Sequence, residues 1–282
     1  MKATAKKWFE GRRLLIATKH GKERVIAPVL EQALGVICVV PNDYDTDQFG
    51  TFTGEIKRLV DPLETARKKC KAAMSKYGFD LAIASEGSFG PHPTIGFLPC
   101  NEELLLLIDQ RNSLEITERE LSTETNMDCA NITTEDELHA FTRSCGFPEH
   151  GVVLSIPGTG EITKGIDTLQ KLTRTFQRYK KTADKVLIET DMRAMHNPTR
   201  MKVIEKAVIK LSERILNHCP ECYSPGFGIS EAIPGLPCEM CNLPTKSTLA
   251  YRYSCLRCDH TLQLPKSDKK KEDAAFCDYC NP

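Results

Sequence analysis

The sequence is short of the features that would direct a chain to a membrane or to nucleic acid. Its longest apolar runs, GVICVVP and LLLLI, fall far below the roughly 20 residues that span a bilayer. Its first residues hold several cations but no uninterrupted apolar segment of the kind found in secretory signals. Lys and Arg total 38 and Asp and Glu total 38, so the net charge is zero and gives no general attraction to polyanions. We therefore expect a globular protein of the cytoplasm.

Common catalytic and ligand-binding signatures are also missing. The P-loop pattern G-x-x-x-x-G-K-[ST] does not occur. Ser88 lies in EGSFG, which lacks the first glycine of the G-x-S-x-G nucleophile elbow. Asp43, Asp45 and Asp47 alternate, but the glycine and final glutamate of an EF-hand loop are absent. We interpret these three aspartates as part of a solvated acidic loop.

What the sequence does contain, before residue 218, is an alternation of short apolar runs and helix-like segments. The expected strands are 13–18, 36–40, 81–84, 104–109, 114–121, 152–156 and 185–190. The expected helices are 23–34, 62–77, 134–145, 167–182 and 199–217. This alternation predicts an α/β domain over residues 1–217, with a sheet flanked by helices. The strands on either side of QRNS predict an antiparallel hairpin, so the sheet should be mixed.

Four polar residues mark where these helices should begin. Asp61 precedes a proline and is expected to cap the helix from residue 62. Asp167 is expected to cap the helix that follows it, and Thr134 begins a capping-box pattern. Asn197 stands before Pro198, which is typical of the first turn of a helix.

The most specific signal is a cysteine-rich tail. Eight of the 13 cysteines form four C-x-x-C pairs. The odd total, the missing signal peptide and the strict spacing favour metal-binding thiolates in a reducing compartment over disulfides. The paired cysteines are Cys219, Cys222, Cys238, Cys241, Cys255, Cys258, Cys277 and Cys280.

Four C-x-x-C pairs supply the ligands of two zinc ions. Zinc is held tetrahedrally by four thiolates, and one C-x-x-C turn presents two of them. Fifteen residues separate Cys222 from Cys238, and eighteen separate Cys258 from Cys277, which fits the hairpins of zinc ribbons. This spacing favours pairing of the first pair with the second and of the third with the fourth, and it leaves a cross-braced pairing open. We predict a double zinc-ribbon module over residues 218–282.

The predicted zinc sites are closed, which indicates a structural role. All four ligands of each site are thiolates, so no coordination position remains for a water molecule. Residues 219–282 contain seven Lys and Arg and eight Asp and Glu. Eight thiolates with two Zn²⁺ add about −4, so the tail is acidic and disfavours nucleic acid. The tail is better suited to docking a protein partner.

Polar residues follow two of the expected strands at the edge where α/β proteins bind ligands. Lys19, His20 and Lys22 lie in the loop after the first strand, where backbone N–H groups at a helix start can hold an anion. Glu64 lies early in the next helix, and Glu86 follows the strand at 81–84. Two carboxylates beside lysines would suit a Mg²⁺–phosphate complex. The alternative is an ordinary turn with solvated side chains.

The segments IATKHGKE, PLETARKKCKAA and AIASEGSFG, in this order, resemble the inosine/xanthosine triphosphate pyrophosphatases over about residues 13–125. The resemblance implies that Lys22 binds phosphate and that Glu64 and Glu86 hold a metal ion. The loop is one residue shorter than in that family, and SEGS stands where the family has DDSG. The whole chain, with TDMRAMHNPTR and the cysteine tail, also resembles an uncharacterised bacterial family that has no assigned mechanism.

Two further segments contribute site candidates. In SEGSFGPHP we expect Gly87 and Gly90 to form a tight turn, with Ser88 and His92 beside Glu86 as one wall of a site. In ETDMRAMHNPTR the guanidinium groups suit phosphate, which makes Arg193 and Arg200 candidate ligands. The alternative for the second segment is that Asp191 and Arg193 pair locally and that His196 packs against its neighbours.

Two functions are compatible with these observations. In the first, the α/β domain binds a nucleotide or another phosphorylated small molecule and hydrolyses a pyrophosphate bond with Mg²⁺. Lys22, Glu64 and Glu86 would then be catalytic, and the two zinc ions would be structural. In the second, the chain is a non-enzymatic adaptor whose zinc module binds a protein partner.

Overall fold

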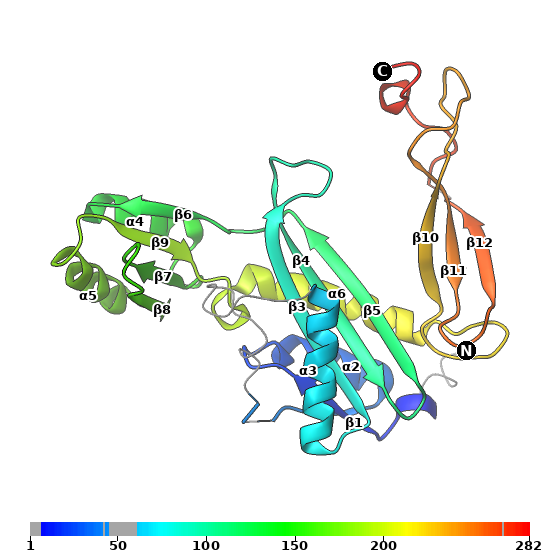
Figure 1. Cartoon of the computed structure of the whole chain (residues 1–282), viewed down its shortest axis with the longest axis horizontal. Helices are drawn as coiled ribbons and strands as arrows, with labels where there is room; N and C mark the ends of the chain where they lie inside the picture. The colour runs from blue at the N-terminus through cyan, green and yellow to red at the C-terminus, as the bar shows by residue number, and fades with distance from the viewer. Residues whose placement is uncertain (1–6, 42, 45–60, 267) are drawn as a thin grey trace.

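The computed structural model describes residues 7–41, 43–44, 61–266 and 268–282, and its strands form three separate sheets (Figure 1). The first sheet has the order β2-β1-β3-β4-β5. Strands β2, β1 and β3 are parallel, whereas β4 and β5 are antiparallel to their neighbours. The elements of this part are β1 (Arg13–Ala17), α2 (Glu23–Leu34), β2 (Ile37–Val39), α3 (Pro62–Tyr77), β3 (Leu81–Pro91), β4 (Pro99–Asp109) and β5 (Leu114–Ser122). The predicted mixed sheet flanked by helices, with a β4–β5 hairpin, is therefore confirmed.

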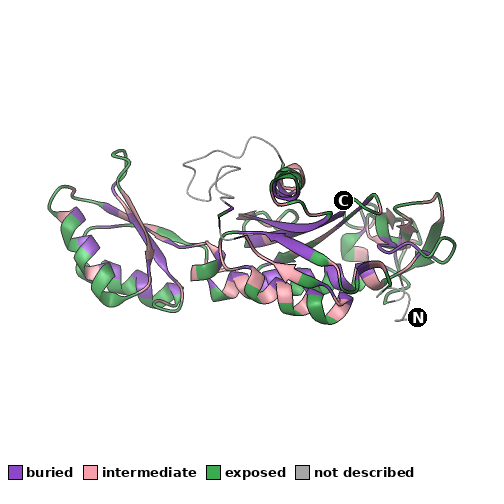
Figure 2. Ribbon diagram, turned by 90° about the horizontal axis from the view of Figure 1, so that it is seen from below, coloured by how far each residue is buried: buried purple, intermediate pink, exposed green. Residues whose placement is uncertain are grey.

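Both faces of the first sheet are covered by helices, as Figure 2 shows around its buried strands. Leu14 and Ile16 of β1 pack with α2 and with the long helix α6 (Pro198–Leu216). Leu15 and Ala17 point to the opposite face and pack with α3. Because side chains alternate along a strand, a strand that is buried on both faces must be apolar throughout, as RLLIA is after its first residue.

Strand β3 continues well past the point where the sequence predicts a tight turn. Gly87 pairs with Glu103 and Gly90 with Cys100 in an uninterrupted antiparallel register that reaches Pro91. The predicted turn at these glycines is therefore wrong. The chain reverses later, in residues 92–98, where Nδ1 of His92 accepts hydrogen bonds from the backbone N–H groups of Thr94 and Ile95, both at 3.1 Å.

A second, antiparallel sheet lies beside the first and has its own core. Its order is β6-β9-β7-β8, and helices α4 and α5 pack on it. Its elements are β6 (Cys129–Ile132), α4 (Glu135–Cys145), β7 (Val152–Ser155), β8 (Ile162–Ile166), α5 (Leu169–Lys180) and β9 (Val186–Thr190). The helices and the strands 152–156 and 185–190 are predicted from the sequence, but their place in a sheet separate from the first is not. The division of the chain at residue 218 stays a prediction.

Three of the four expected helix starts are present. Asp61 accepts from the backbone of Leu63 and Glu64, and Thr134 forms the expected capping box with Glu137. Asn197 accepts from the backbone N–H of Arg200 at 2.9 Å.

At the fourth helix start, α5 is capped by Thr168 and not by Asp167. Asp167 instead forms an ion pair with Lys171 at 2.6 Å. The expected cap was therefore one residue too early.

The cysteine-rich tail forms the third sheet, which extends beyond the C-terminal end of α6 (Figure 1). Its elements are β10 (Gly228–Pro234), β11 (Thr248–Ser254), β12 (Thr261–Pro265) and the short helix η3 (Ala274–Phe276). The three strands are antiparallel in the order β10-β11-β12. In the part of the chain that the structure describes, no helix has the length and apolar character needed to cross a membrane.

Candidate functional site

The eight paired cysteines gather into two groups of four, one at each end of the three-stranded sheet. The ligand atoms within each group all lie within 4.8 Å of one another. Among the described residues, these are the only groups of three or more side chains that could hold a metal ion. The groups are Cys219, Cys222, Cys255 and Cys258, and Cys238, Cys241, Cys277 and Cys280.

The sulfur positions fit zinc. A tetrahedral ion with Zn–S bonds of 2.3 Å separates its thiolates by about 3.8 Å. In the first group, the Sγ atoms of Cys222 and Cys255 are 3.5 Å apart, and those of Cys219 and Cys258 are 3.7 Å apart. In the second group the corresponding distances are 3.7 and 3.9 Å. These distances are far too long for disulfides, at about 2.05 Å, and match two Cys₄ zinc sites.

The C-x-x-C pairs combine into these groups in a cross-braced order. The sequential order favoured by the spacing is therefore wrong. The first pair joins the third, and the second joins the fourth. The sheet explains this arrangement. One strand separates each pair from the next, and each antiparallel strand carries the chain to the opposite end of the sheet. Pairs that are separated by two strands therefore meet.

Backbone donors in the C-x-x-C turns stabilise the thiolate form. Sγ of Cys255 accepts from the N–H groups of Arg257 and Cys258, at 3.3 and 3.4 Å. Burial acts to raise the pKa of the Cys255 thiol, but these backbone donors, together with hydrogen bonds from the thiols of Cys222 and Cys258, outweigh it and lower the pKa to about 7. Because zinc binds the deprotonated sulfur, the turn prepares the ligand for the metal ion.

A second site candidate is a cluster of buried charges at the carboxyl end of β1. Strand β1 ends beside Ala84 of β3, and the next two residues of β3 extend past it. There Oε1 of Glu86 lies 2.5 Å from Nζ of Lys69, a residue of α3. Lys22, at the start of α2, donates to Oγ of Ser85 at 2.9 Å. All four of these residues are buried.

On the face of the sheet opposite Glu86, which is also the face of Ser85, Arg200 of α6 binds Glu103 of β4. Nε of Arg200 donates to Oε1 of Glu103 at 2.7 Å, and Nη1 donates to the carbonyl of Met192 at 2.5 Å. The two side chains are 1% and 0% exposed. Gly87 makes room for them, because a Cβ at this position would collide with Nη2 of Arg200 and lie 2.5 Å from Oε1 of Glu103. This close approach explains a glycine within a long strand.

Lys22 interacts electrostatically with both halves of the cluster. Burial lowers the pKa of Lys22 to about 7, and Arg200 and Lys69 act in the same direction. Glu103 and Glu86 act to raise it. When Lys22 is protonated, Lys22, Lys69 and Arg200 face two carboxylates, so these described residues of the cluster then hold one cation in excess.

Two of the other predicted site residues lie in ion pairs of their own. Glu64 is 38% exposed and binds Arg67 at 2.5 Å. Arg193 binds Asp191 with Nη2 at 2.6 Å, which is the local pair that the sequence analysis kept as an alternative. Burial acts to raise the pKa of Asp191, but hydrogen bonds and charge from Arg193 outweigh it and hold the pKa below its usual value.

The remaining predicted residues lie on the loops and strands around the cluster. Lys19 and His20 are in the β1–α2 loop. This loop lies near Met195, because a Cβ added at Gly21 would be 3.6 Å from Cβ of Met195. Ser88 lies on β3, with Oγ 3.5 Å from Oε2 of Glu102. The side chain of His92 accepts hydrogen bonds from backbone N–H groups of its own turn, as described above.

In the acidic loop, Asp43 binds Lys76 at 3.0 Å and the hydroxyl of Tyr77 at 2.7 Å. Asp45 and Asp47 lie outside the described residues.

Two members of the cluster, Lys69 and Glu103, were missed by the sequence analysis. Lys69 stands in the basic run ARKKCK, where nothing local separates it from solvated neighbours. Glu103 directly precedes LLLLI. A buried acid within an apolar strand has to be paired with a cation. The position of Glu103 next to this apolar run was therefore the signal that could have identified it as a buried, paired carboxylate.

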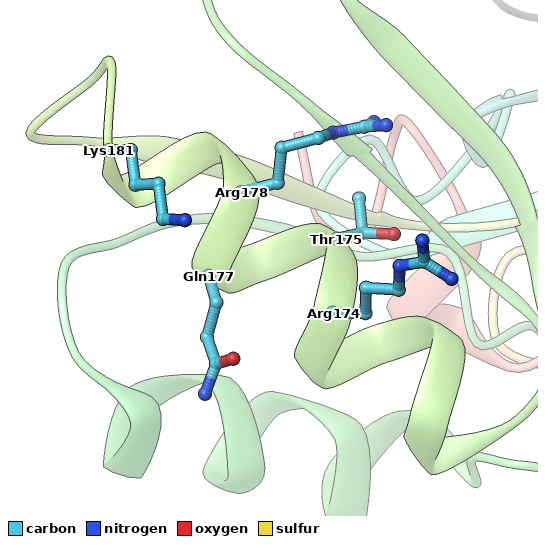
Figure 3. A pocket seen from close by; sticks show the side chains of 5 residues that line it. All are labelled: Arg174, Thr175, Gln177, Arg178 and Lys181. Carbon is cyan, nitrogen blue, oxygen red and sulfur yellow. The ribbon is translucent and has the colours of Figure 1, made fainter.

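A cationic cavity on α5 is a weaker candidate. It has a volume of about 390 Å³, and Figure 3 shows Arg174 and Arg178 extending past Thr175 on the helix. Arg178 already donates to Oγ1 of Thr163 at 3.0 Å and lies over the ring of Tyr179. Both arginines are exposed, so water and salt screen their charge. The lining residues are Arg174, Thr175, Gln177, Arg178 and Lys181.

Comparison with known proteins gives a family but no activity. No curated protein matches the chain. Among solved structures, protein VC0702 from Vibrio cholerae is similar at 11% identity and a TM-score of 0.36, over 76% of this chain and 99% of that one. The family described as Domain of unknown function (DUF6671) matches residues 69–282, from α3 through the last cysteine pair. The chain belongs to this DUF6671 family.

Proposed function

We propose that the α/β part of the chain binds a phosphorylated small molecule, and specifically a nucleotide, at the buried charge cluster and hydrolyses a pyrophosphate bond in it. The observation that carries this proposal is the excess cation among Lys22, Lys69, Arg200, Glu86 and Glu103. The cluster lies at the carboxyl end of β1 and the start of α2. In α/β proteins, this edge of the sheet and such helix starts are where anions bind.

The electrostatics of Lys22 favour an anionic ligand. A buried ammonium group is costly, and this cost appears as the lowered pKa of Lys22. A phosphate beside Nζ would offset the excess charge and raise that pKa again. A neutral ligand would leave the cost in place, so the cluster selects for negative charge.

Glu86 is the carboxylate that the cluster offers to a metal–phosphate complex. It is 5% exposed and forms an ion pair with Lys69. Mg²⁺, when bound with the phosphates, would supply charge neutralisation and take a carboxylate oxygen as a ligand. Lys22 and Lys69 would then hold the phosphate oxygens and stabilise the charge that develops on them during hydrolysis.

An activity assay tests this function. We expect the zinc-loaded protein to hydrolyse one or more nucleoside triphosphates from a panel, and to do so faster with added Mg²⁺. Lys22→Met should lower turnover about 100-fold or more, because it removes a charge that stabilises the transition state. Glu86→Gln should weaken the Mg²⁺ dependence.

The matched control is Lys76→Met, which removes an exposed lysine of α3 that binds Asp43. It should leave turnover unchanged. Absence of turnover across the panel, or equal loss in the Lys22 and Lys76 variants, would contradict the proposed function.

A further inference from the structure

The two groups of cysteines differ in what lies beside them. The first group, which contains Cys219, adjoins the α/β part of the chain, because Cys219 follows the end of α6 by three residues. The second group, which contains Cys277, lies at the opposite end of the three-stranded sheet and near the C-terminus. Figure 1 shows this end of the sheet extending away from the other elements. The two predicted zinc sites therefore have different surroundings.

The residues that follow the first cysteine pair are hydrogen-bonded to the end of α6. Nδ2 of Asn217 donates to the carbonyl of Phe227 at 2.7 Å. The carbonyl of Asn217 accepts in turn from the backbone N–H groups of Gly226 and Phe227, at 3.1 and 3.0 Å. Three hydrogen bonds thus join the C-terminal cap of α6 to the chain just before β10.

Arg214 of α6 extends this contact to β5. Its Nη1 atom donates to the carbonyl of Thr117 and to Oε1 of Glu118, both at 2.9 Å. The same side chain lies against Gly228, where an added Cβ would be 2.9 Å from Nε of Arg214. One side chain of α6 therefore contacts both β5 and the first residue of β10.

The turn of the third cysteine pair packs near the core of the α/β part. Gly226 separates the two, because a Cβ added there would be 2.9 Å from Cδ1 of Ile116 and 2.9 Å from Cδ1 of Leu256. Ile116 is a core residue of β5 and is 0% exposed, and Leu256 stands between the two cysteines of the third pair. In the same turn, the guanidinium of Arg257 lies 5.7 Å from the ring centre of Trp8, which packs against that core.

The second group makes its contacts within the zinc module. Nζ of Lys246 lies 2.8 Å from Oδ2 of Asp278, and Nζ of Lys271 donates to Oδ1 of Asn242 at 2.8 Å. Among the described residues, the hydrogen bonds and ion pairs of the turns around this group join residues of 235–282 to one another. The second group therefore has no such connection to α6 or β5 in the described part of the chain.

We propose that zinc binding at the first group holds the zinc module against the α/β part and orders the end of α6 and the start of β5, whereas zinc binding at the second group orders only the free end of the sheet. In a small zinc module the free energy of metal binding is also free energy of folding. Without the metal ion, the turn that carries Leu256 and Arg257 would not be held beside Ile116 and Trp8. The adjoining ends of α6 and β5 should then open locally.

This role belongs to the end of α6 that is opposite Arg200. It is therefore independent of what the buried charge cluster binds, and its test needs no substrate.

Hydrogen exchange of the full chain tests the proposal in the variant Cys222→Ser with Cys255→Ser, which removes two thiolates of the first group. We expect this variant to keep one zinc ion per chain. The amides of residues 114–118 and 211–217 should exchange about tenfold faster or more than in the wild type, because local opening exposes them to water.

The matched control is Cys241→Ser with Cys277→Ser, whose sulfurs lie 3.7 Å apart in the second group. It removes the same number of thiolates and should also keep one zinc ion. Exchange in both segments should stay as in the wild type.

A second pair of variants keeps all eight thiolates. Leu256→Ala with Arg257→Ala shortens the two side chains that face the α/β part, and Asp278→Ala with Tyr279→Ala changes the equivalent positions of the fourth cysteine pair. Both should retain two zinc ions, and only the first should show faster exchange at residues 114–118.

The alanine variants decide the question if the Cys222/Cys255 variant does not fold. Unchanged exchange in the first-group variant that is measured would overturn the proposal, as would an equal increase in its matched second-group control.

Discussion

A variant with Cys222→Ser and Cys255→Ser should keep one zinc ion per chain and lose the other. The two sulfurs lie 3.5 Å apart in one group, so both substitutions damage the same site. The second group keeps all four of its thiolates. A structural zinc site contributes on the order of 10 kcal/mol at neutral pH, so the loss of one should unfold that end of the module. Metal analysis of the reduced protein counts the ions that remain.

The matched comparison is Cys222→Ser with Cys241→Ser, which removes the same number of thiolates from two different groups. This variant should lose both zinc ions or bind both weakly. Sequential pairing predicts the reverse, since Cys222 and Cys241 would then share one ion. If the Cys222/Cys241 variant is the one that retains a full zinc ion, the cross-braced arrangement is wrong.

A second large effect is expected at Arg200. Replacing it by methionine leaves the carboxylate of Glu103, which is 0% exposed, without its strongest partner. Breaking a buried ion pair in this way typically costs about 3–5 kcal/mol. We therefore expect a marked fall in the free energy of unfolding, measured by urea denaturation.

The double variant Arg200→Met with Glu103→Met should recover much of this loss, because it removes the uncompensated charge as well. Lys76→Met serves again as the control, since its pair with Asp43 is exposed and should matter little. An Arg200→Met protein as stable as the wild type would show that the pair does not hold α6 to the sheet.

Sequence periodicity predicts the helices and most strands of this chain well, because those signals are local. RLLIA is apolar over four successive residues, and Asp61-Pro62 marks a helix start. The second sheet was not separated from the first, because its strands pair across long stretches of sequence. Its strand β8, ITKGI, has a mixed character that does not indicate a strand.

The extent of β3 shows a different limit. Gly87 and Gly90 are typical turn residues, yet both lie in the strand. At Gly87 the glycine is explained by the side chain of Arg200, which fills the space that a Cβ would occupy, whereas a Cβ at Gly90 would meet no atom within 4 Å. Arg200 is 113 positions from Gly87 in the sequence, so the nine residues around Gly87 do not indicate this contact.

The charge cluster could be predicted only in part, because some of its residues meet through contacts between segments that are distant in the sequence. Lys22 and Glu86 follow strands, so the rule on strand ends brings them to one edge. Lys69 and Glu103 join them only through the packing of α3 and β4. The eight cysteines were identified by their spacing, but their pairing depends on the direction of the strands between them.

The central claim, that the buried cluster binds phosphate, is tested most directly by proton uptake. Lys22 has a pKa of about 7, so near pH 7 it is roughly half protonated. A phosphate beside Lys22 raises this pKa, so on binding the Lys22 amine should take up about half a proton at pH 7 and almost none near pH 5.

Calorimetric titration of a nucleoside triphosphate without Mg²⁺, in buffers of different ionisation enthalpy, measures this uptake. The terminal phosphate of the ligand also titrates near neutral pH, so the account predicts that the wild-type protein takes up about half a proton more than Lys22→Met at pH 7. Absence of triphosphate binding, or binding with the same proton uptake in both proteins, would contradict it.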